Sequence, residues 1–326
     1  MKSIARFCLL SLFLLLAAGC AITPPHPQSF SFAVTGDTPY TATEEVDMEW
    51  MIEDLGHLDL AFIVHVGDFK AGSNSPCTDA LFDQRKRQFD KSAHPFIYVP
   101  GDNDWVDCRR SNNGGADALE RLQRLREVFF AKPRSLGKTT LPLDQPDEEC
   151  IGQAGKKSCS RYSENAMWER GGVVFATLNI QGSNNNLGFD AASDAEFALR
   201  ENANEAWMQR AFARANQPGM HGLVLLLQAN PGFEEKMENV RKSGFRQFLE
   251  AFSREAGAFA KPVLFVHGDT HLYRIDAPLR NPLDGKRIAN ATRLETYGSP
   301  VTGWVKVTVD QNHPALFRIQ SGGTYP

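Results

Sequence analysis

The chain has 326 residues, of which 42% are hydrophobic and 23% are charged, and its formal net charge at pH 7 is −4. This composition is close to the average of soluble globular proteins, so it excludes a disordered chain and provides enough apolar surface for a substantial core. The acidic balance and the lack of a long basic run argue against nucleic acid as a partner, because binding of phosphate backbones requires clustered Lys and Arg.

The N-terminus has the pattern of a secretion signal. Lys2 and Arg6 precede an apolar run over residues 7–16, which is too short to cross a bilayer as a resident helix. Three small residues and Cys20 follow, and this order resembles a bacterial lipobox. The resemblance implies a lipoprotein-type signal over residues 1–19 and lipidation of Cys20. The alternative is an ordinary secretion signal in which Cys20 has no special role.

The residues that follow Cys20 predict where the protein resides. Residue 21 is alanine rather than aspartate, which by resemblance to lipoprotein sorting signals implies the outer membrane, facing the periplasm. Residues 20–29 contain three prolines and predict a stiff, extended spacer. We therefore expect the membrane to be a partner through a lipid anchor at Cys20.

Beyond the spacer, apolar runs alternate with amphipathic segments. Runs rich in β-branched and aromatic residues predict buried strands at 30–34, 60–66, 95–99, 173–178, 223–227 and 262–266. Apolar residues at helical spacing predict helices at 119–129, 193–215 and 245–252. This alternation predicts an α/β fold that forms one domain over residues 30–326.

Two segments depart from the alternation. Residues 136–160 are rich in Gly and Lys and predict a surface excursion. After residue 271 the apolar runs become shorter and alternate with polar residues. They predict antiparallel strands at 273–275, 292–297, 304–309 and 316–319.

The cysteines predict two disulfides. Four remain after Cys8 and Cys20 are set aside, and an even number in an oxidising compartment is typical of disulfide pairing. We expect Cys77 to pair with Cys108 and Cys150 with Cys159, which is the favoured one of three possible arrangements. Four free buried thiols are the alternative.

Four apolar strands are followed by Gly-Asp. The aspartates are Asp37, Asp68, Asp102 and Asp269. Glycine lets the backbone turn sharply, and ligands of open α/β sheets gather outside the carboxyl ends of the strands. One Gly-Asp turn is common in loops, but four of them predict a shared acidic crevice. Because carboxylates brought together repel one another unless a cation neutralises them, the crevice is predicted to bind a divalent metal.

The segment from about residue 30 to residue 271 resembles the calcineurin-like metallophosphoesterase family. Its motifs read Asp-x-His, Gly-Asp, Gly-Asn-His-Asp or Glu, a later His, and Gly-His-x-His. Asp37 matches the first aspartate, and Asp68 matches the aspartate that bridges two metal ions. Asp104 matches the acidic end of the third motif, and His271 matches the last histidine. The resemblance implies a four-layer αββα sandwich.

The chain departs from the family pattern at several nitrogen positions. Pro39 replaces the histidine of the first motif, and Asn103 replaces the histidine that helps to bind phosphate. Asp102 replaces the ligand asparagine, Gln228 takes the place of the later histidine, and Asp269 replaces the first histidine of the last motif. Aspartate and glutamine still offer oxygen ligands.

These replacements bear on the metal. One implied site uses Asp68, Asp102, Gln228 and Asp269, and the other uses Asp37, Asp68 and His271. Oxygen-rich shells suit hard ions, so we expect one or two ions of Mg²⁺, Mn²⁺ or Ca²⁺ rather than Zn²⁺.

The candidate groups for catalysis and substrate binding lie near the same motifs. Asn103 would orient a phosphate, and Asp104 is the matched acidic residue of that motif. Lys70 and Arg109 would bind the phosphate charge, and Arg109 is followed by a second arginine. His65 and His267 are possible replacements for the lost histidine, although a buried structural role is the more common fate of such residues.

Two functions follow from this reading. The first is a metal-dependent hydrolase of phosphate mono- or diesters, in which a bound hydroxide attacks a small phosphate-ester substrate. The second is a catalytically inactive metal- or ligand-binding envelope lipoprotein with the same fold. The change of ligands to oxygen donors, rather than to apolar residues, favours the hydrolase.

Overall fold

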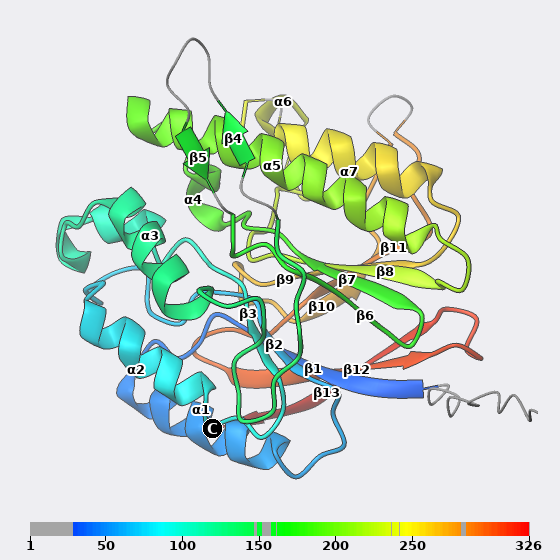
Figure 1. Cartoon of the computed structure of the whole chain (residues 1–326), viewed down its shortest axis with the longest axis horizontal. Coiled ribbons are helices and arrows are strands. Elements are labelled where there is room, and N and C mark those ends of the chain that lie inside the picture. Colours follow the sequence, from blue (N-terminus) through cyan, green and yellow to red (C-terminus); the bar gives the residue numbers. More distant parts are fainter. Residues whose placement is uncertain are drawn as a thin grey trace, which may run out of the picture.

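The computed structural model describes residues 29–146, 149–151, 158–160, 162–235, 237–240, 242–281 and 285–325 (Figure 1). The predicted signal, its lipidation site Cys20 and the spacer up to residue 28 lie outside the described residues. Among the helices that are described, we find none long and apolar enough to cross a membrane.

Two mixed sheets form the centre of the molecule. The first has the order β13-β12-β1-β2-β3. Its strands are β1 (Ser29–Thr35), β2 (Ile63–His65), β3 (Phe96–Tyr98), β12 (Thr302–Asp310) and β13 (Phe317–Tyr325). The second has the order β10-β11-β9-β8-β7-β6. Its strands are β6 (Met167–Arg170), β7 (Val173–Thr177), β8 (Gly222–Leu226), β9 (Val263–His267), β10 (Arg274–Asp276) and β11 (Ala291–Glu295).

Helices cover the outer face of each sheet, as Figure 1 shows. The first sheet is covered by α1 (Ala42–Leu55), α2 (Asp79–Phe89) and α3 (Ala118–Phe129). The second is covered by α5 (Ala191–Ala215) and α7 (Arg246–Ala258). The shorter elements are α4 (Gly182–Asn185), α6 (Met237–Val240), the 3₁₀ turns η1 (Val106–Arg109) and η2 (Ser111–Asn113), and the hairpin β4 (Glu149–Ile151) and β5 (Ser158–Ser160). The predicted four-layer αββα sandwich is therefore confirmed.

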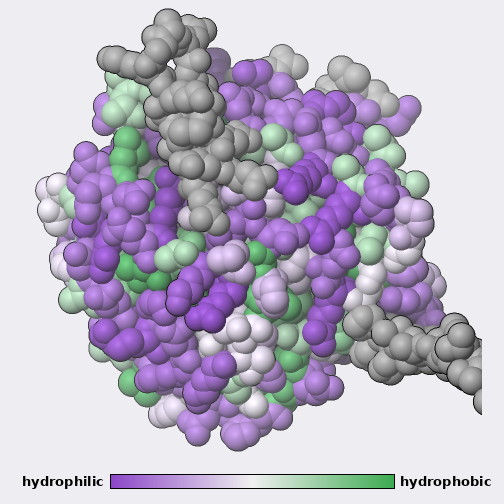
Figure 2. Space-filling view, in the orientation of Figure 1, coloured by the Kyte–Doolittle hydropathy of each residue, from purple (hydrophilic) through white to green (hydrophobic). Residues whose placement is uncertain are grey.

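The apolar runs of the sequence fill the spaces between these layers. On β1, Phe32 and Val34 point into the core between the two sheets, while Ala33 points to the helices on the other face. Both faces of the strand are buried, which explains why the run is continuously apolar rather than alternating. On the molecular face in Figure 2, hydrophilic side chains cover most of the surface and apolar ones are scattered among them.

Parallel pairing aligns the strand ends that precede the Gly-Asp motifs. Strands β1, β2 and β3 run parallel, with Thr35, His65 and Tyr98 in register at their carboxyl ends. In the second sheet β7, β8 and β9 also run parallel to one another. The loops that follow these strands therefore meet at one edge of the sandwich.

The structure corrects two details of the sequence analysis. Strand β11 pairs antiparallel with β10 but parallel with β9, so the segment 292–297 belongs to the parallel part of the second sheet. The excursion 136–160 is partly integrated into the fold, because Leu136 pairs with Phe96 at the edge of the first sheet and Leu143 is buried in the core. Both differences depend on long-range pairing, which local patterns do not encode.

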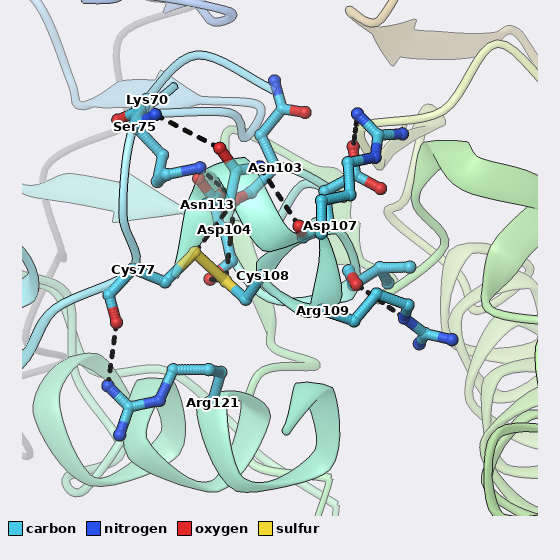
Figure 3. The surroundings of a disulfide bond; sticks show 12 residues. Lys70, Ser75, Cys77, Asn103, Asp104, Asp107, Cys108, Arg109, Asn113 and Arg121 are labelled. Atoms are coloured by element: carbon cyan, nitrogen blue, oxygen red, sulfur yellow. Dashed lines mark hydrogen bonds and ion pairs between the residues drawn. A yellow bond between two sulfur atoms is a disulfide. The ribbon is translucent and has the colours of Figure 1, made fainter. Parts of the chain in front are cut away.

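The predicted disulfide between Cys77 and Cys108 is confirmed (Figure 3). It joins the loop after β2 to the 3₁₀ turn η1 after β3, and both cysteines are buried. Backbone pairing places Cys150 opposite Cys159 in the β4–β5 hairpin. Their side chains lie outside the described part of the chain, so the second disulfide stays a prediction.

We expect the first disulfide to stabilise the loops at the strand ends. Its cysteines are 31 residues apart, and loop closure of that length stabilises a protein by about 3–4 kcal/mol. The double variant Cys77→Ser/Cys108→Ser should lose about that much free energy of unfolding in urea denaturation under oxidising conditions. Wild type and variant should converge once a reductant is added. Equal midpoints in oxidising buffer would contradict the prediction.

Candidate functional site

The four aspartates of the Gly-Asp motifs gather at the shared edge of the two sheets. Asp37 follows β1 and Asp269 follows β9. The backbone N–H of Asp269 donates to Asp37 Oδ2 at 3.0 Å and to Asp37 Oδ1 at 3.1 Å. Gln228 bridges Asp68 Oδ2 and Asp269 Oδ1 through its side-chain nitrogen, at 3.1 and 3.5 Å. Asp102 Oδ1 and Asp269 Oδ1 both face the Cα of Gly182, and a Cβ there would lie 2.6 and 2.8 Å from them. We call these four aspartates the acidic centre.

The backbone is bent sharply to form this centre. Asp37, Asp68 and Asp269 have φ angles of 51°, 57° and 79°, in the left-handed region. The short polar side chain of aspartate tolerates this region better than most, but it still costs about 1–2 kcal/mol per residue. Gly101 is also constrained, because a Cβ at that position would lie 2.0 Å from Asp68 Oδ1. Unfavourable backbone geometry that recurs within one group of loops is typical of functional sites.

Burial and mutual repulsion raise the pKa values of these carboxyls. Burial, followed by the nearby charge of Asp269, raises the pKa of Asp37 well above its ordinary value. The pKa of Asp68 is raised in the same way by burial and then by Asp102. Burial and the charge of Asp102 raise the pKa of Asp269 to about 7. The centre therefore favours either bound protons or a cation.

Asp102 carries an oxygen without a partner. Its Oδ2 accepts a hydrogen bond from Ser183 Oγ at 2.8 Å, but its Oδ1 has no hydrogen-bond partner in the described chain. The residue is only 7% exposed. A buried, unpaired carboxylate oxygen is costly, so this position is suited to a positively charged ligand.

Gln228 does not fit the ligand role that the family resemblance implies. Its Oε1 accepts the backbone N–H of Gly182 at 2.7 Å, and this bond fixes the orientation of the amide. The NH₂ group consequently faces the acidic centre and donates to Asp68 and Asp269. If the amide were flipped, its NH₂ would face the N–H of Gly182, and two hydrogen-bond donors would meet without an acceptor. We therefore assign Gln228 to positioning these two carboxylates.

His271 and Tyr40 complete the opposite corner of the centre. His271 Nδ1 lies 2.6 Å from the carbonyl oxygen of Ser299 and donates to it, which leaves Nε2 as an acceptor. Nε2 lies 3.7 Å from Asp37 Oδ1 and 3.4 Å from the Tyr40 hydroxyl. That hydroxyl is also 3.4 Å from Asp68 Oδ2. Of these distances, the 3.7 Å between His271 Nε2 and Asp37 Oδ1 joins two groups that could contact one divalent ion.

The residues of the third motif have two different roles. Asn103 donates its backbone N–H to Asp68 Oδ1 at 2.9 Å, and its side-chain NH₂ to the Tyr40 hydroxyl at 3.1 Å. Asp104 is fully buried and accepts hydrogen bonds from the backbone of Asp68, Phe69 and Gly101 and from the Tyr98 hydroxyl. These bonds make Asp104 a positioning residue of the strand-end loops, in place of the expected catalytic role.

The basic residues predicted to bind substrate are turned to other partners. Lys70 is 1% exposed, and its ammonium donates to the carbonyl oxygens of Ala71 and Asn103 (Figure 3). Arg109 donates to Ser193 and Asn186, and its guanidinium stacks 3.9 Å from the ring centroid of Phe189. Both are therefore structural in this arrangement.

Arg110 places its guanidinium beside the acidic centre. It forms a 2.7 Å ion pair with Asp107 and lies 3.4 Å from Ser183, which in turn bonds Asp102. Its side chain is 47% exposed, so it remains accessible to an anion. The sequence analysis named Arg109 for phosphate binding, whereas Arg110, which directly follows the 3₁₀ turn η1, is the arginine that faces the centre.

His65 and His267, the possible replacements for the lost histidine of the third motif, are buried and bind backbone carbonyl oxygens. His65 Nε2 bonds the carbonyl oxygen of Thr38, and burial lowers its pKa to about 4. His267 Nδ1 bonds the carbonyl oxygen of Gly268, and burial lowers its pKa to about 3. Both rings are thus neutral at ordinary pH, and each serves the strand in which it lies.

The described residues fit a cation although they do not form a finished chelate. Within the part of the chain that is described, no group of three or more His, Cys, Asp or Glu side chains is arranged as a metal site. The reason is visible in the hydrogen bonds, since backbone N–H groups and the Gln228 amide bind several of the carboxylate oxygens. The unpaired Asp102 Oδ1 and the His271–Asp37 corner nevertheless provide donors that suit a hard divalent ion.

Two residues of the site, Tyr40 and Ser183, were given no role by the sequence analysis. Tyr40 lies three residues after Asp37. The Asp-x-His motif points to residue 39, which is proline here, and assigns no role to residue 40. Ser183 bonds Asp102 and also Asp107, at 2.8 and 2.7 Å. Ser183 lies in a Gly-Ser-Asn-Asn-Asn stretch after β7, and its amide-rich composition was the available signal.

Comparisons with known proteins support the fold. The sequence matches no protein-family model and none of the curated proteins. Among solved structures, a dimetal phosphatase from Danio rerio is 8% identical, with a TM-score of 0.51 over 90% of this chain and 95% of that one. Plasmodium GAP50, described as the anchor in the inner membrane complex, is 10% identical, with a TM-score of 0.50 over 90% of this chain and 84% of that one. The fold is metallophosphoesterase-like.

The acidic centre should make the stability of the metal-free protein depend on pH. The folded-state pKa of Asp269 is about 7, above its ordinary value of 3.8. The folded state therefore binds more protons than the unfolded state between these values, and stability falls as the pH rises from 4 to 7. Chelator-treated protein should have a lower free energy of unfolding in urea at pH 8 than at pH 5.

The variant Asp269→Asn should reduce the loss of unfolding free energy between pH 5 and pH 8 by about 1–3 kcal/mol, because it removes the carboxylate charge that the other aspartates repel. The exposed Asp59→Asn is the matched control and should retain the full pH dependence. An identical pH dependence in Asp269→Asn and wild type would show that Asp269 does not contribute.

Proposed function

We propose that this chain is a metal-dependent hydrolase of phosphate mono- or diesters. The observation that carries the proposal is the acidic centre, in which four aspartates from four separate strand ends meet. Holding these charges together is unfavourable unless something positive lies between them. The fold supports the proposal because a solved structure with this fold is described as a dimetal phosphatase.

A cation at the acidic centre would supply the positive charge that attracts a phosphate, and it would lower the pKa of a water so that it can attack in line. Asp37, Asp68 and His271 would hold it at one corner, and Asp102 with Asp269 would hold a cation at the other. The donors are mostly oxygens, which favours Mg²⁺, Mn²⁺ or Ca²⁺ over Zn²⁺.

The surroundings of the centre suit an anionic substrate. Arg110 is partly exposed beside Ser183 and Asp102, where its guanidinium can bind two phosphate oxygens at once. The hydrogen bond from Arg110 to the carbonyl oxygen of Gly72, at 2.8 Å, connects it to the loop after β2. Its position is therefore fixed relative to Asp68, which lies in the same loop.

A second candidate function is a binding protein of the same fold without turnover. The observation that favours it concerns the histidines described around the acidic centre: His65 and His267 are buried and neutral, and His271 faces Asp37 as a proposed cation ligand rather than as a general acid. General acid catalysis contributes about 10²- to 10⁴-fold to such reactions. A protein with this fold, Plasmodium GAP50, is described as an anchor.

We also propose that the domain works in an oxidising compartment, lipid-anchored through Cys20 to the bacterial envelope. The Cys77–Cys108 disulfide supports this proposal, because disulfides are rare in reducing compartments. Metabolic labelling of the intact chain with a palmitate analogue tests it, and Cys20→Ser should abolish the label. Label that persists in Cys20→Ser would contradict the anchor.

The variant Asp68→Asn tests the metal-dependent hydrolase. It keeps the shape of the side chain and a residue type that tolerates the left-handed backbone, but it removes the charge at the middle of the centre. We expect the affinity for Mn²⁺, measured by calorimetry, to fall at least about 10-fold. The Mn²⁺ content of the purified protein, measured by elemental analysis, should fall with it. Hydrolysis of aryl phosphate mono- and diesters should be lost with it.

Asp59→Asn, an exposed aspartate, is the matched control and should keep wild-type metal content and rate. Unchanged metal affinity in Asp68→Asn would reject the metal site. Normal metal binding by the wild type without hydrolysis of either ester, with Mg²⁺, Mn²⁺ or Ca²⁺, would favour the binding protein.

A further inference from the structure

Tyr40 is a polar group at the acidic centre to which neither the motifs nor the proposed metal ligands assign a role. It follows Asp37 by three residues, directly before helix α1, and its backbone N–H donates to Glu44 Oε2 at 2.7 Å. Its ring packs edge-on against His271, with the centroids 5.4 Å apart. Both contacts fix the phenol, so its hydroxyl has a defined place in the centre.

The partners of the Tyr40 hydroxyl determine where its proton points. Asn103 Nδ2 donates to the hydroxyl oxygen at 3.1 Å. Asp68 Oδ2 and His271 Nε2, each 3.4 Å away, are acceptors, because Nδ1 of His271 already donates to the carbonyl oxygen of Ser299. The oxygen thus receives a hydrogen bond on the Asn103 side, and its own proton is directed toward the acidic centre.

From this geometry we infer that Tyr40, oriented by Asn103, is the neutral donor that binds a phosphoryl oxygen of the substrate. The inference rests on the proposed hydrolase function. Asp68 and His271 would hold the cation of the proposed function, and the Tyr40 proton would then be free to be donated to an anion at the same place. No proton is transferred in this step. The hydroxyl donates a hydrogen bond to an oxygen whose negative charge grows during attack.

The inference gives Asn103 a specific role. An asparagine amide cannot donate a proton as an imidazolium does, but it can hold a phenol whose hydroxyl reaches further into the centre. Asn103 also donates its backbone N–H to Asp68 Oδ1, so one residue orients both the carboxylate and the phenol. We therefore regard Asn103 as a positioning residue and Tyr40 as the group that touches the substrate.

Four variants test this assignment: Tyr40→Phe, Asn103→Ala, the combination of both, and Tyr297→Phe. Tyr297 bonds Ser321 at an exposed position and is the matched control for loss of one hydroxyl. The readouts are Mn²⁺ affinity by calorimetry, affinity of the Mn²⁺-loaded protein for inorganic phosphate, and kcat and KM for an aryl phosphate. Thermal midpoints verify that each variant is folded.

We expect Tyr40→Phe to keep its Mn²⁺ affinity and to bind phosphate about 10- to 100-fold more weakly, as is typical of losing a hydrogen bond to a charged group. Asn103→Ala should have a smaller effect of the same kind. The combined variant should be no weaker than Tyr40→Phe, because both changes act through one hydroxyl. Tyr297→Phe should behave as the wild type.

Three results would overturn the inference while leaving the proposed function intact. These are unchanged phosphate affinity in Tyr40→Phe, a loss of Mn²⁺ affinity in that variant, which would make Tyr40 a ligand, and additive losses in the combined variant. A wild-type protein that binds Mn²⁺ but no phosphate would overturn both the inference and the hydrolase. A wild type that binds no Mn²⁺ would remove the metal site on which both depend.

Discussion

Repulsion among four carboxylates, three of them buried and one partly buried, is the constraint around which this edge of the molecule is organised. Asp37, Asp68, Asp102 and Asp269 come from strands of both sheets, and burial raises the pKa of each. The chain offsets part of the repulsion with neutral donors, including the Asp269 N–H on Asp37 and the Gln228 amide on Asp68. These donors weaken the repulsion but leave the net charge unchanged, which is why a cation is the natural complement of the site.

The two corners of the acidic centre are neutralised differently. At the Gln228 corner an amide occupies the place of a metal-ligating group, yet Asp102 Oδ1 remains unpaired. At the other corner His271 presents an oriented nitrogen to Asp37, with the Tyr40 hydroxyl alongside. Where the metallophosphoesterase motifs have histidines, this chain thus has hydrogen-bond donors as well as oxygen donors, and this composition differs from that of a two-metal centre built on imidazoles.

A layer of buried polar groups holds the loops in their unfavourable conformations. Asp104 collects three backbone N–H groups and the Tyr98 hydroxyl beneath Asp68. Residues 183–186 all have positive φ angles, between 47° and 67°. Arg200, fully buried, donates to the side chain and the backbone of Asn185 in that turn. Each of these bonds satisfies a group that would otherwise be buried and unpaired, and together they support the loops that carry the acidic centre.

The sequence by itself determined the α/β alternation and the strand ends that carry the acidic centre, while the family resemblance implied the four layers and the Cys77–Cys108 disulfide was one of three possible arrangements. The alternation and the strand ends follow from local information, since apolar runs specify buried strands and parallel strands align their carboxyl ends. Only the tertiary structure decided that Gln228 turns its NH₂ inward, that Arg110 rather than Arg109 faces the centre, and that Tyr40 belongs to it. The partners that fix these side chains are remote, as in the 46 residues between Gln228 and Gly182 and the 63 between Tyr40 and Asn103. The direction of a polar side chain is set by such partners, and a linear pattern does not contain them.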